Sequence, residues 1–324
     1  MSNSSITYSV IIPHKNSLDF LRRLVISIPI RDDLEVLVVD DNSQNVTSDD
    51  WKQFQKDYPH VHLFLTTEGK GAGYARNVGL SHAVGEWAIF ADADDFFYPD
   101  AFNQLDKWSD SDMDIIYFVC DSRNGTTLAP CSDRMPGIRQ SIKERNIGRL
   151  RFNSLVPWGK MIRRSLIEEH YIRFDEVEVS NDVMFSMRVG LYVQNADVIE
   201  MPLYCCTNNA GSLVFHHTIE RAKIRCKVYK NANDFLHHNG LDHYRMPFDR
   251  SVYPHMKIML HNRPDLFLKY LWRIRYKDDF SAYFKDVALL GWNKSRLILS
   301  NKTNSRVHKS RNYIKHYVAK ILRK

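Results

Sequence analysis

The chain lacks the cysteine patterns of disulfide-bonded and zinc-binding proteins. It has only 5 cysteines in 324 residues, an odd number, and none of them forms a Cys-x-x-Cys pair. Neither a disulfide framework nor a zinc site is therefore expected. We expect reduced and mostly structural side chains at Cys120, Cys131, Cys205, Cys206 and Cys226.

Long apolar runs are also missing. No segment approaches the roughly 20 apolar residues that a membrane-spanning helix needs. Residues 1–5, Met-Ser-Asn-Ser-Ser, have neither the basic stretch nor the apolar core of a secretory signal. These absences predict a cytoplasmic protein. A hydrophobic content of 44% over 324 residues suffices for one large core and a smaller helical extension.

Acidic residues gather where apolar runs end. The run over residues 87–90 is followed by Ala-Asp-Ala-Asp-Asp over 91–95, and the run over 34–39 is followed by Asp40 and Asp41. Short apolar runs of this kind are typical of parallel strands that are buried on both faces. Open α/β sheets bind ligands at the carboxyl ends of their strands, so the carboxylates lie where a ligand and a cation are expected. The alternative is solvated turns, because Asp also favours turns and helix caps.

The first 120 residues alternate between strand and helix patterns. Further strands are predicted over residues 9–12, 62–65 and 115–119. Helices are predicted around residues 18–28, 51–54 and 74–83, the first with Asn16 or Ser17 as its cap. This alternation predicts an α/β fold with a sheet of the nucleotide-binding type.

The acidic strand ends suggest a chemistry. Mg²⁺ or Mn²⁺ prefers oxygen ligands, and one or two carboxylates commonly hold it together with the phosphates of a substrate. A nucleotide diphosphate meets this requirement, and the metal can neutralise charge on the departing diphosphate. We expect Asp94 to be the main metal ligand and Asp92 to be a second ligand or a ribose contact. Asp40, Asp41 and residues 13–16 would line the base and ribose pocket.

Four motifs follow one another in the first 95 residues. They read Ser-Val-Ile-Ile-Pro over 9–13, Val-Val-Asp-Asp-Asn-Ser over 38–43, Gly-Tyr-Ala-Arg-Asn-Val-Gly over 73–79 and Asp-Ala-Asp-Asp over 92–95. Together they closely resemble the GT-A glycosyltransferases of family two, which use nucleotide sugars to build bacterial capsules, O-antigens and teichoic-acid decorations. The resemblance extends over residues 6–215, with Pro-Trp-Gly-Lys at 157–160, Arg-Phe-Asp-Glu at 173–176 and Asn-Asp-Val-Met-Phe at 181–185.

The resemblance implies a fold and an activity. The fold is a GT-A type, mixed and mostly parallel sheet flanked by helices, with a catalytic domain over residues 1–215. Its nucleotide-sugar half covers 1–120 and its acceptor half covers 121–215. Helical periodicity, many aromatic residues and dense positive charge separately predict a basic helical region over 216–324. The activity is a metal-dependent, inverting transfer of a hexose or N-acetylhexosamine from a nucleotide diphosphate sugar, UDP by default. The acceptor would be a hydroxyl of a saccharide or a lipid-linked oligosaccharide in surface polysaccharide assembly.

The resemblance also implies residue roles. Asp94 and Asp92 bind Mn²⁺ or Mg²⁺, and Asp182 is the catalytic base that takes the proton of the acceptor hydroxyl as it attacks opposite the diphosphate. Contacts with the donor nucleotide sugar come from Pro13, His14, Lys15, Asn16, Asp40, Asp41, Lys70, Arg76, Asn77, Asp92, Ala93 and Ser212. Contacts with the acceptor come from Trp158, Lys160, Glu178 and Asn181.

Several acceptor-side roles have alternatives. A carboxylate within hydrogen-bond reach can accept the proton of a sugar hydroxyl, yet Asp182 could instead cap the helix that follows it. Asn181 stands where the family usually has Glu, which leaves open whether Glu176 or Glu178 orients the acceptor. Trp158 could stack on a sugar or pack in the core.

The segment over residues 204–213 departs from the family pattern. Ser212 fits the serine that contacts the pyrophosphate, but Thr207 stands where an arginine is usual. Cationic help for the leaving group would then come from the metal, from Lys70 or from the histidine pair at 216–217. For that pair, surface or core placement is the alternative.

Two other enzyme classes fit less well. Gly69, Gly71 and Gly73 do not follow the first strand, where a dinucleotide-binding loop of an oxidoreductase belongs. A sugar nucleotidyltransferase is the enzymatic alternative. It needs a glycine-rich basic loop after the first strand, and residues 13–17 contain no glycine.

Positive charge is concentrated at the end of the chain. The formal net charge is +7, and residues 302–324 contain eight Lys or Arg and no acid. Ile314, Val318 and Ile321 share one helical face, which predicts a basic amphipathic helix on the anionic cytoplasmic face of the inner membrane. The alternatives are a solvated tail or a helix packed on the catalytic domain. A non-enzymatic protein that binds membrane or nucleic acid through 216–324 is a further alternative, but no nucleic-acid motif is present, so no such partner is expected.

Overall fold

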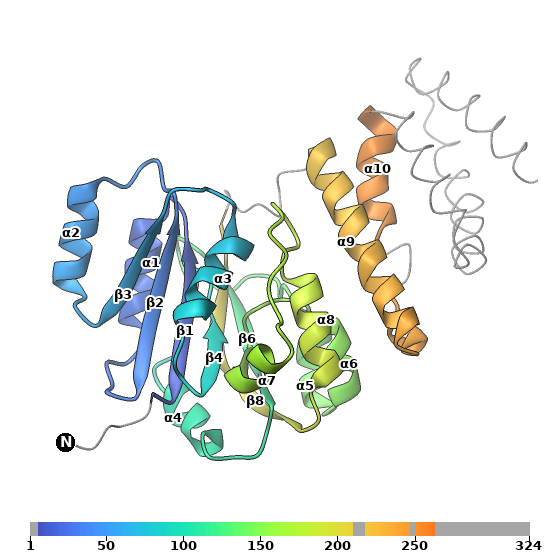
Figure 1. Cartoon of the computed structure of the whole chain (residues 1–324), viewed down its shortest axis with the longest axis horizontal. Helices are drawn as coiled ribbons and strands as arrows, with labels where there is room; N and C mark the ends of the chain where they lie inside the picture. The colour runs from blue at the N-terminus through green and yellow to red at the C-terminus, as the bar shows by residue number, and fades with distance from the viewer. Residues whose placement is uncertain (1–5, 210–217, 247–250, 263–324) are drawn as a thin grey trace, which may run out of the picture. The chain divides into compact units, whose positions relative to one another are not determined.

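The computed structural model describes residues 6–209, 218–246 and 251–262 (Figure 1). The strands are β1 (Tyr8–His14), β2 (Leu34–Asp41), β3 (Val61–Thr66), β4 (Trp87–Phe90), β5 (Phe96–Phe97), β6 (Ile115–Asn124), β7 (Lys160–Arg163) and β8 (Ala196–Asn208). The helices are α1 (Leu18–Ile26), α2 (Ser48–Asp57), α3 (Ala72–His82), α4 (Ala101–Leu105), α5 (Pro136–Lys143), α6 (Ile147–Asn153), α7 (Arg164–Glu169), α8 (Val183–Tyr192), α9 (Ile219–His238) and α10 (Tyr253–Asn262).

The strands of the described residues form one eight-stranded sheet in the order β3-β2-β1-β4-β7-β6-β8-β5. Strands β1 to β4 are parallel to their sheet neighbours in this group, and β6 is parallel to β8. Strand β7 is antiparallel to both β4 and β6, and β5 is antiparallel to β8. The predicted mixed, mostly parallel sheet is confirmed.

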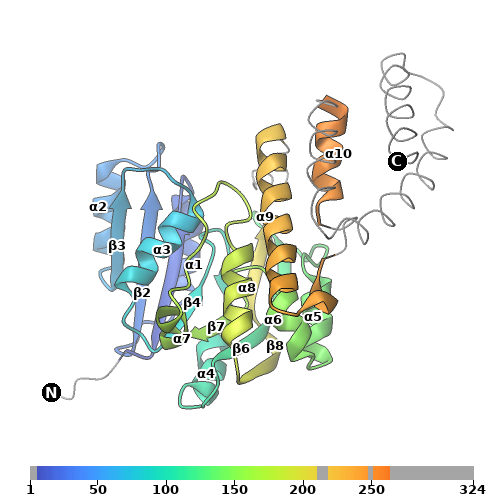
Figure 2. The same cartoon turned by 45° about the vertical axis from the view of Figure 1, so that its right-hand side comes forward.

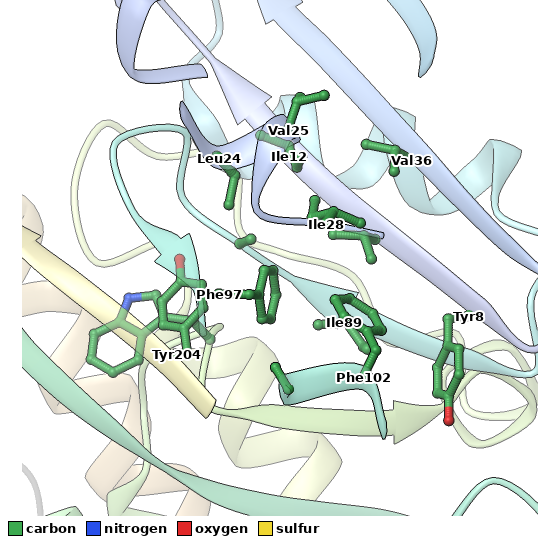
Figure 3. Close-up of a cluster of buried hydrophobic side chains, with 14 of the residues drawn as sticks. Tyr8, Ile12, Leu24, Val25, Ile28, Val36, Ile89, Phe97, Phe102 and Tyr204 are labelled. Atoms are coloured by element: carbon green, nitrogen blue, oxygen red, sulfur yellow. The ribbon is translucent and has the colours of Figure 1, made fainter. Parts of the chain in front are cut away.

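The central strands are buried on both faces, which explains their continuous apolar sequence. Alternate residues of β1 face opposite layers: Ile12 belongs to the cluster that contains Leu24 of α1, whereas Ile11 belongs to the cluster that contains Leu80 of α3. Figure 3 shows part of the first cluster, with Ile12 near Leu24. The helices therefore hold the strand ends in a fixed relation, and the loops after these ends carry the acidic residues.

The second cluster also fixes the segment that precedes α8. The ring of Phe174 stacks on Phe185 of α8 with centroids 3.9 Å apart, and it meets Phe90 of β4 edge-on at 5.0 Å. Helices α5, α6 and α8 lie side by side in both views of the ribbon (Figures 1 and 2). Phe174 is thus held between α8 and the end of β4 by aromatic packing.

The chain divides into two compact units. One consists of residues 1–216 and 231–244, and the other consists of 217–230 and 245–324, so that α9 contributes to both. Within the second unit, the ring of Tyr229 stacks on that of His255 with centroids 5.7 Å apart. Ser212, the histidine pair at 216–217 and the basic segment 302–324 lie outside the described residues.

Two further expectations can be compared with the structure. All five cysteines are free thiols in the structure. Among the described residues, no helix has the length and apolar character that would let it cross a membrane.

Candidate active site

The carboxyl ends of β1, β2 and β4 meet at one edge of the sheet. His14 lies opposite Asp40 in the parallel register of β1 and β2, and Ile11 of β1 lies opposite Phe90 of β4. The acidic loop at residues 92–95 directly follows β4. The structure therefore brings together the acidic strand ends that the sequence places far apart.

His14 and Asp40 form a buried pair beneath this edge. Their exposed fractions are 1% and 4%, and the Nδ1 of His14 lies 2.8 Å from Oδ1 of Asp40. The backbone N–H of Ser17 donates to Nε2 of His14, so Nδ1 carries the proton and donates to Asp40. Burial acts to raise the pKa of Asp40, but hydrogen bonds from His14 and Ser43 outweigh it and hold this pKa below its usual value.

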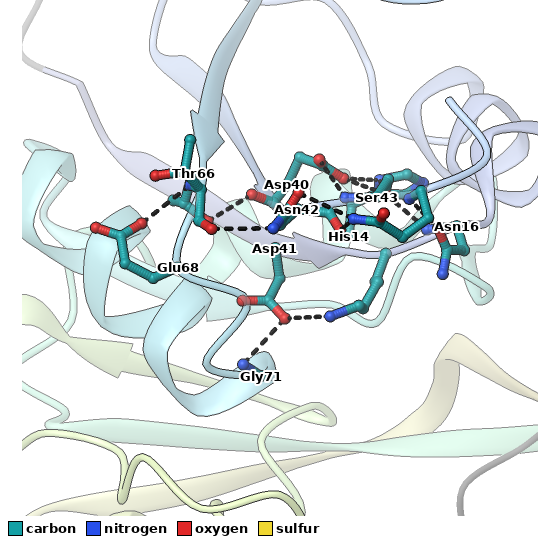
Figure 4. A network of polar contacts seen from close by, with 12 residues as sticks. His14, Asn16, Asp40, Asp41, Asn42, Ser43, Thr66, Glu68 and Gly71 are labelled. Atoms are coloured by element: carbon teal, nitrogen blue, oxygen red, sulfur yellow. Dashed lines mark hydrogen bonds and ion pairs between the residues drawn. The ribbon is translucent and has the colours of Figure 1, made fainter. Parts of the chain in front are cut away.

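Hydrogen bonds also tie the loops after the first three strands to one another (Figure 4). The backbone N–H of Asn16 donates to Oγ of Ser43 at 2.7 Å, and the side-chain amide of Asn42 donates to the carbonyl of Thr67 at 2.9 Å. Asn16 and Asn42 both have φ of 58°, a left-handed conformation that Asn tolerates better than most residues. These contacts fix the entrance to the strand-end site.

Asp41 points from the end of β2 toward the loop before α3. Its Oδ2 accepts hydrogen bonds from Nζ of Lys15 at 3.0 Å and from the backbone N–H of Gly71 at 2.9 Å (Figure 4). Its Oδ1 is buried and has no hydrogen-bond partner among the described residues. Lys70, beside Gly71, is exposed and lies over the ring of Tyr74 at 4.7 Å.

Helix α3 links the acidic loop to the segment before α8. Arg76 is 5% exposed, and its Nη2 donates to Oδ1 of Asp92 at 2.5 Å while its Nη1 donates to Oδ1 of Asn181 at 2.9 Å. Asn77 exchanges two hydrogen bonds with the backbone of Phe174, at 3.0 and 2.8 Å. Arg76 thus joins Asp92, predicted for the donor side, to Asn181, predicted for the acceptor side. Asn77 holds the backbone at Phe174, in the segment that leads to Asn181.

A glycine permits the close approach of these two segments. A Cβ atom at Gly73 would lie 2.3 Å from the carbonyl oxygen of Asp175 and 2.9 Å from Cβ of Asn181. Real Cβ atoms do not approach backbone oxygens this closely, so only glycine fits here. The backbone of α3 can therefore pack directly on the loop that precedes Asp182.

Strand β8 holds the acidic loop from the other side. The buried hydroxyl of Tyr204 donates to Oδ2 of Asp95 at 2.7 Å and accepts from the backbone N–H of Asp92 at 2.9 Å. The backbone N–H of Thr207 donates to Oδ1 of Asp95 at 2.7 Å. Burial is the main cause that raises the pKa of Asp95 well above its usual range, with Asp94 and Asp92 acting in the same direction.

Asp94 is half-buried between three elements. Its Oδ2 accepts a hydrogen bond from the amide of Asn209 at 2.7 Å, and its carbonyl accepts from Oγ1 of Thr207 at 2.7 Å and from Nη2 of Arg23. Burial and the neighbouring carboxylate of Asp92 raise the pKa of Asp94. Ala93, between the two carboxylates, is 8% exposed.

These carboxylates fit a divalent cation that shares its coordination with a substrate. Among the described residues, no group of three or more His, Cys, Asp or Glu side chains is arranged to hold a metal ion without other ligands. Asp92 and Asp94 supply hard oxygen ligands, and a cation between them would relieve the repulsion that raises the pKa of Asp94. Mg²⁺ and Mn²⁺ sites of this kind take their remaining ligands from phosphates and water.

Asp182 immediately precedes α8 and is half-buried. It occupies the N-cap position, but its side chain makes no capping hydrogen bond at the start of the helix. Burial raises its pKa and Asp92 acts in the same direction, whereas Arg76 and Lys160 oppose this rise.

Two of the predicted acceptor contacts are buried below the surface. Trp158 is 3% exposed and stacks on Tyr204 with centroids 6.0 Å apart. Lys160 is 2% exposed, and its Nζ donates to the carbonyl of Ser154 at 2.7 Å and to Oγ of Ser186 at 3.3 Å. The packing alternative for Trp158 agrees with this burial. Glu178 is exposed, and Asn181 is 8% exposed.

Residues that the sequence analysis did not select also reach this site. Tyr204, Asn209, Arg23 and Arg134 contact the acidic loop or its immediate neighbours. Tyr204 and Asn209 lie in the segment 204–213, but no role was predicted for them there, and Arg23 and Arg134 belong to none of the motifs. Only the pairing of β8 with β5 and β6 brings Tyr204 and Asn209 close to it.

A comparison with known families decides the class of the protein. The model of the glycosyl transferase family 2 matches residues 9–171, which contain the strand ends, α3 and the acidic loop. The chain belongs to glycosyl transferase family 2. The prediction that it is a glycosyltransferase is thereby confirmed.

Relatives and solved structures agree with this membership. The family-2 chain is 27% identical over 243 residues to EpsH of Bacillus subtilis, which is named as a glycosyltransferase, across 71% of this chain and 69% of that protein. It is 26% identical over 211 residues to the poly(ribitol-phosphate) beta-N-acetylglucosaminyltransferase TarS of Staphylococcus aureus, across 63% of this chain but only 36% of TarS.

The fold matches two solved structures. The structure of residues 1–349 of TarS with UDP-GlcNAc has a TM-score of 0.55 at 20% identity, across 85% of this chain and 75% of that chain. The mannosyltransferase PcManGT from Pyrobaculum calidifontis, solved with GDP-Man and Mn²⁺, has a TM-score of 0.51 at 20% identity, across 90% and 81% of the two chains. These matches confirm the predicted GT-A fold.

Proposed function

We propose that this chain is a metal-dependent, inverting glycosyltransferase that moves a sugar from a nucleotide diphosphate sugar to a hydroxyl of a saccharide or lipid-linked acceptor. The observation that carries the proposal is the double contact of Arg76. One guanidinium joins Asp92, from the acidic loop, to Asn181, which precedes Asp182. A candidate metal ligand and the residue before the candidate base are thus bonded to the same side chain.

The donor nucleotide would lie across the ends of β1 and β2. Oδ1 of Asp41 has no hydrogen-bond partner among the described residues, so it is available to accept from an N–H of the base. Lys15 and Lys70 are exposed at the rim and can attract the negatively charged donor. We assign positioning roles to His14 and Asp40, because they are buried and bonded to each other.

Mn²⁺ or Mg²⁺ would be held by Asp94 and Asp92, and when bound it would supply Lewis-acid stabilisation to the departing diphosphate. The loop is anchored by Tyr204 and Thr207, so the two carboxylates are held in place before the donor arrives. Such preorganisation lowers the cost of assembling the site around a charged ligand.

Asp182 would be the base that receives the proton of the acceptor hydroxyl. Its side chain makes no capping hydrogen bond with α8. Burial raises the pKa of this carboxyl, which makes it a stronger proton acceptor than an exposed carboxylate. Arg76 and Lys160 limit this rise, which favours the ionised form that the reaction needs. Attack from the side of Asp182, opposite the diphosphate, would invert the anomeric centre.

UDP is the proposed nucleotide and N-acetylhexosamine or hexose the proposed sugar, supported by the TarS complex with UDP-GlcNAc. The proposed acceptor is a surface polysaccharide or its lipid-linked precursor, supported by the poly(ribitol-phosphate) named for TarS. Glu178, exposed near Asp182 in the sequence, is the residue that we assign to the acceptor.

We propose a cytoplasmic location in which the basic segment 302–324 binds the inner face of the membrane. Deletion of this segment should lower the fraction of protein that sediments with anionic liposomes, and the loss should shrink at high salt. An unchanged bound fraction would rule out the membrane role of this segment while leaving the catalytic proposal intact.

The direct test is a binding and hydrolysis panel. The full chain is incubated with UDP-, GDP- and dTDP-sugars, with and without Mn²⁺, and its melting temperature and the release of nucleotide are recorded. A donor that binds the native state raises the melting temperature, and we expect a UDP-sugar to do so only with metal. A panel with no metal-dependent shift and no nucleotide release would refute the proposal.

A further inference from the structure

A diphosphate bound at the acidic loop would add negative charge to a place that already holds two carboxylates. The carboxylates of Asp92 and Asp94, together with a diphosphate, carry more negative charge than one divalent cation and Arg76 can neutralise. Arg76 is already paired with Asp92. Another cation near Asp94 would therefore favour the binding of a diphosphate there at neutral pH.

Arg134 occupies such a position. It comes from the segment between β6 and α5, and its backbone N–H donates to Oγ of the buried Ser122 at 3.0 Å. Its Nη1 donates to the carbonyl of Thr207 at 3.1 Å, and Oγ1 of Thr207 in turn donates to the carbonyl of Asp94 at 2.7 Å. The backbone of Arg134 is thus bonded to β6, and its guanidinium is bonded to β8 at the residue that also contacts the acidic loop.

The guanidinium of Arg134 keeps unused hydrogen-bond donors after these contacts with the described residues. Arg134 is half-buried and forms no ion pair with any residue in the described part of the chain. A guanidinium has five N–H donors, and a single backbone carbonyl uses one of them.

The other arginine at the loop is less available. Arg23 donates to the carbonyls of Asp94 and Gly125 through its two terminal nitrogens, and its Nε is buried without a partner among the described residues. Its guanidinium also lies over the ring of Phe20 at 5.0 Å. Two donors of Arg23 therefore fix the loop, whereas one donor of Arg134 is used by a carbonyl of the described residues.

We propose that Arg134 binds the diphosphate of the nucleotide donor on the β8 side of Asp94. This inference rests on the proposed function. It goes beyond it by naming a donor-binding residue outside every motif of the sequence. A planar guanidinium suits this task because it can donate two parallel hydrogen bonds to phosphate oxygens.

The test compares ligands that share uridine but differ in phosphate. Binding of uridine, UMP and UDP to the full-length wild type and to Arg134→Gln is measured by calorimetry in the presence of Mn²⁺. We expect about tenfold weaker binding of UDP to the variant, a smaller loss for UMP and no change for uridine, since charged hydrogen bonds contribute of this order. Arg134→Lys should recover part of the UDP affinity, because it keeps the positive charge. The recovery should be incomplete, because lysine lacks the two parallel N–H donors of a guanidinium.

Arg123→Gln is the matched control. Its removal changes the net charge of the protein by the same amount as that of Arg134. Arg123 lies on β6, and its guanidinium donates to the hydroxyl of Tyr98 at 3.2 Å and to the carbonyl of Leu128 at 3.0 Å. We expect UDP affinity within twofold of wild type for this control.

Three outcomes would contradict the inference or its basis. UDP affinity within twofold of wild type in Arg134→Gln would overturn the role of Arg134. An equal loss of uridine and UDP affinity would make it a structural residue only. A wild type that binds no UDP with Mn²⁺ would instead refute the proposed function.

Discussion

Replacement of Lys160 by methionine is expected to stabilise the protein and to remove part of its pH dependence. Lys160 is 2% exposed, and within the described residues its Nζ has the carbonyl of Ser154 and the hydroxyl of Ser186 as hydrogen-bond partners. Burial lowers its pKa from 10.5 to about 7, although the charge of Asp182 acts in the opposite direction. Burial of the charged lysine, away from water, therefore lowers the free energy of unfolding.

The magnitude follows from the shift. A fall from 10.5 to about 7 is worth about 5 kcal/mol between the fully protonated and fully neutral limits, at about 1.4 kcal/mol per pKa unit. At pH 7 roughly 4 kcal/mol of this penalty is present. Methionine removes it but leaves the carbonyl of Ser154 without a donor, which costs about 2 kcal/mol. The expected net gain at pH 7 is about 2 kcal/mol.

The sign of the pH effect is fixed by linkage. Between pH 7 and 10.5 the unfolded chain binds the lysine proton and the folded chain does not, so this group makes stability rise with pH. Below pH 7 both states are protonated and the penalty is constant. From pH 6.5 to 8.5 the wild type should gain about 2 kcal/mol relative to Lys160→Met, because the contributions of groups that do not interact with Lys160 cancel in the difference.

The assay is urea unfolding of both proteins at several pH values, followed by circular dichroism and fluorescence. Lys160→Gln is a useful comparison, because it removes the charge and retains a donor for Ser154. A variant that is less stable than wild type at pH 7, or a difference in stability that does not change from pH 6.5 to 8.5, would refute the reasoning. Without the Lys160 charge, the acidic limb of the pH–rate profile should also move to higher pH, because Lys160 lowers the pKa of Asp182.

Three further variants test the candidate site. Asp94→Ala should lose metal-dependent hydrolysis and transfer while its melting temperature without ligands stays near that of wild type; near-normal turnover would remove Asp94 from the metal site. Asp182→Asn should bind UDP with Mn²⁺ as wild type does, but its transfer rate should fall by at least about a hundredfold. If its transfer persists, another group is the base. Tyr204→Phe should lose about 1–3 kcal/mol of stability, because Asp95 and the backbone N–H of Asp92 lose a buried partner; equal urea midpoints for this variant and wild type would contradict that estimate.

Much of the nucleotide half was predictable from the sequence. Its strands are continuous apolar runs and its helices have regular spacing, so local pattern and buried position agree. The acidic residues directly follow these strands, and parallel strands bring their carboxyl ends to one edge. The prediction that Asp40, Asp41 and the 92–95 loop lie together needed no knowledge of distant contacts.

The acceptor half was less predictable, because its key side chains are defined by long-range pairing. The sequence left open whether Trp158 stacks on a sugar or packs in the core, and its contact with Tyr204 depends on the position of β8 in the sheet. Likewise, the motif pairs Arg76 with Asn77, but their partners, Asn181 and Phe174, lie about a hundred residues further along the chain.

The sequence by itself determined the family, the parallel strands and the edge of the sheet at which acids gather, because these depend on short motifs and on local hydrophobic periodicity. Only the tertiary structure decided which polar groups are already occupied by protein partners. His14 and Asp40 are paired with each other, Asn77 is bonded to a backbone, and Arg134 retains donors beside Asp94. A side chain's availability to a ligand depends on its neighbours in space, and those neighbours are set by the packing of distant segments.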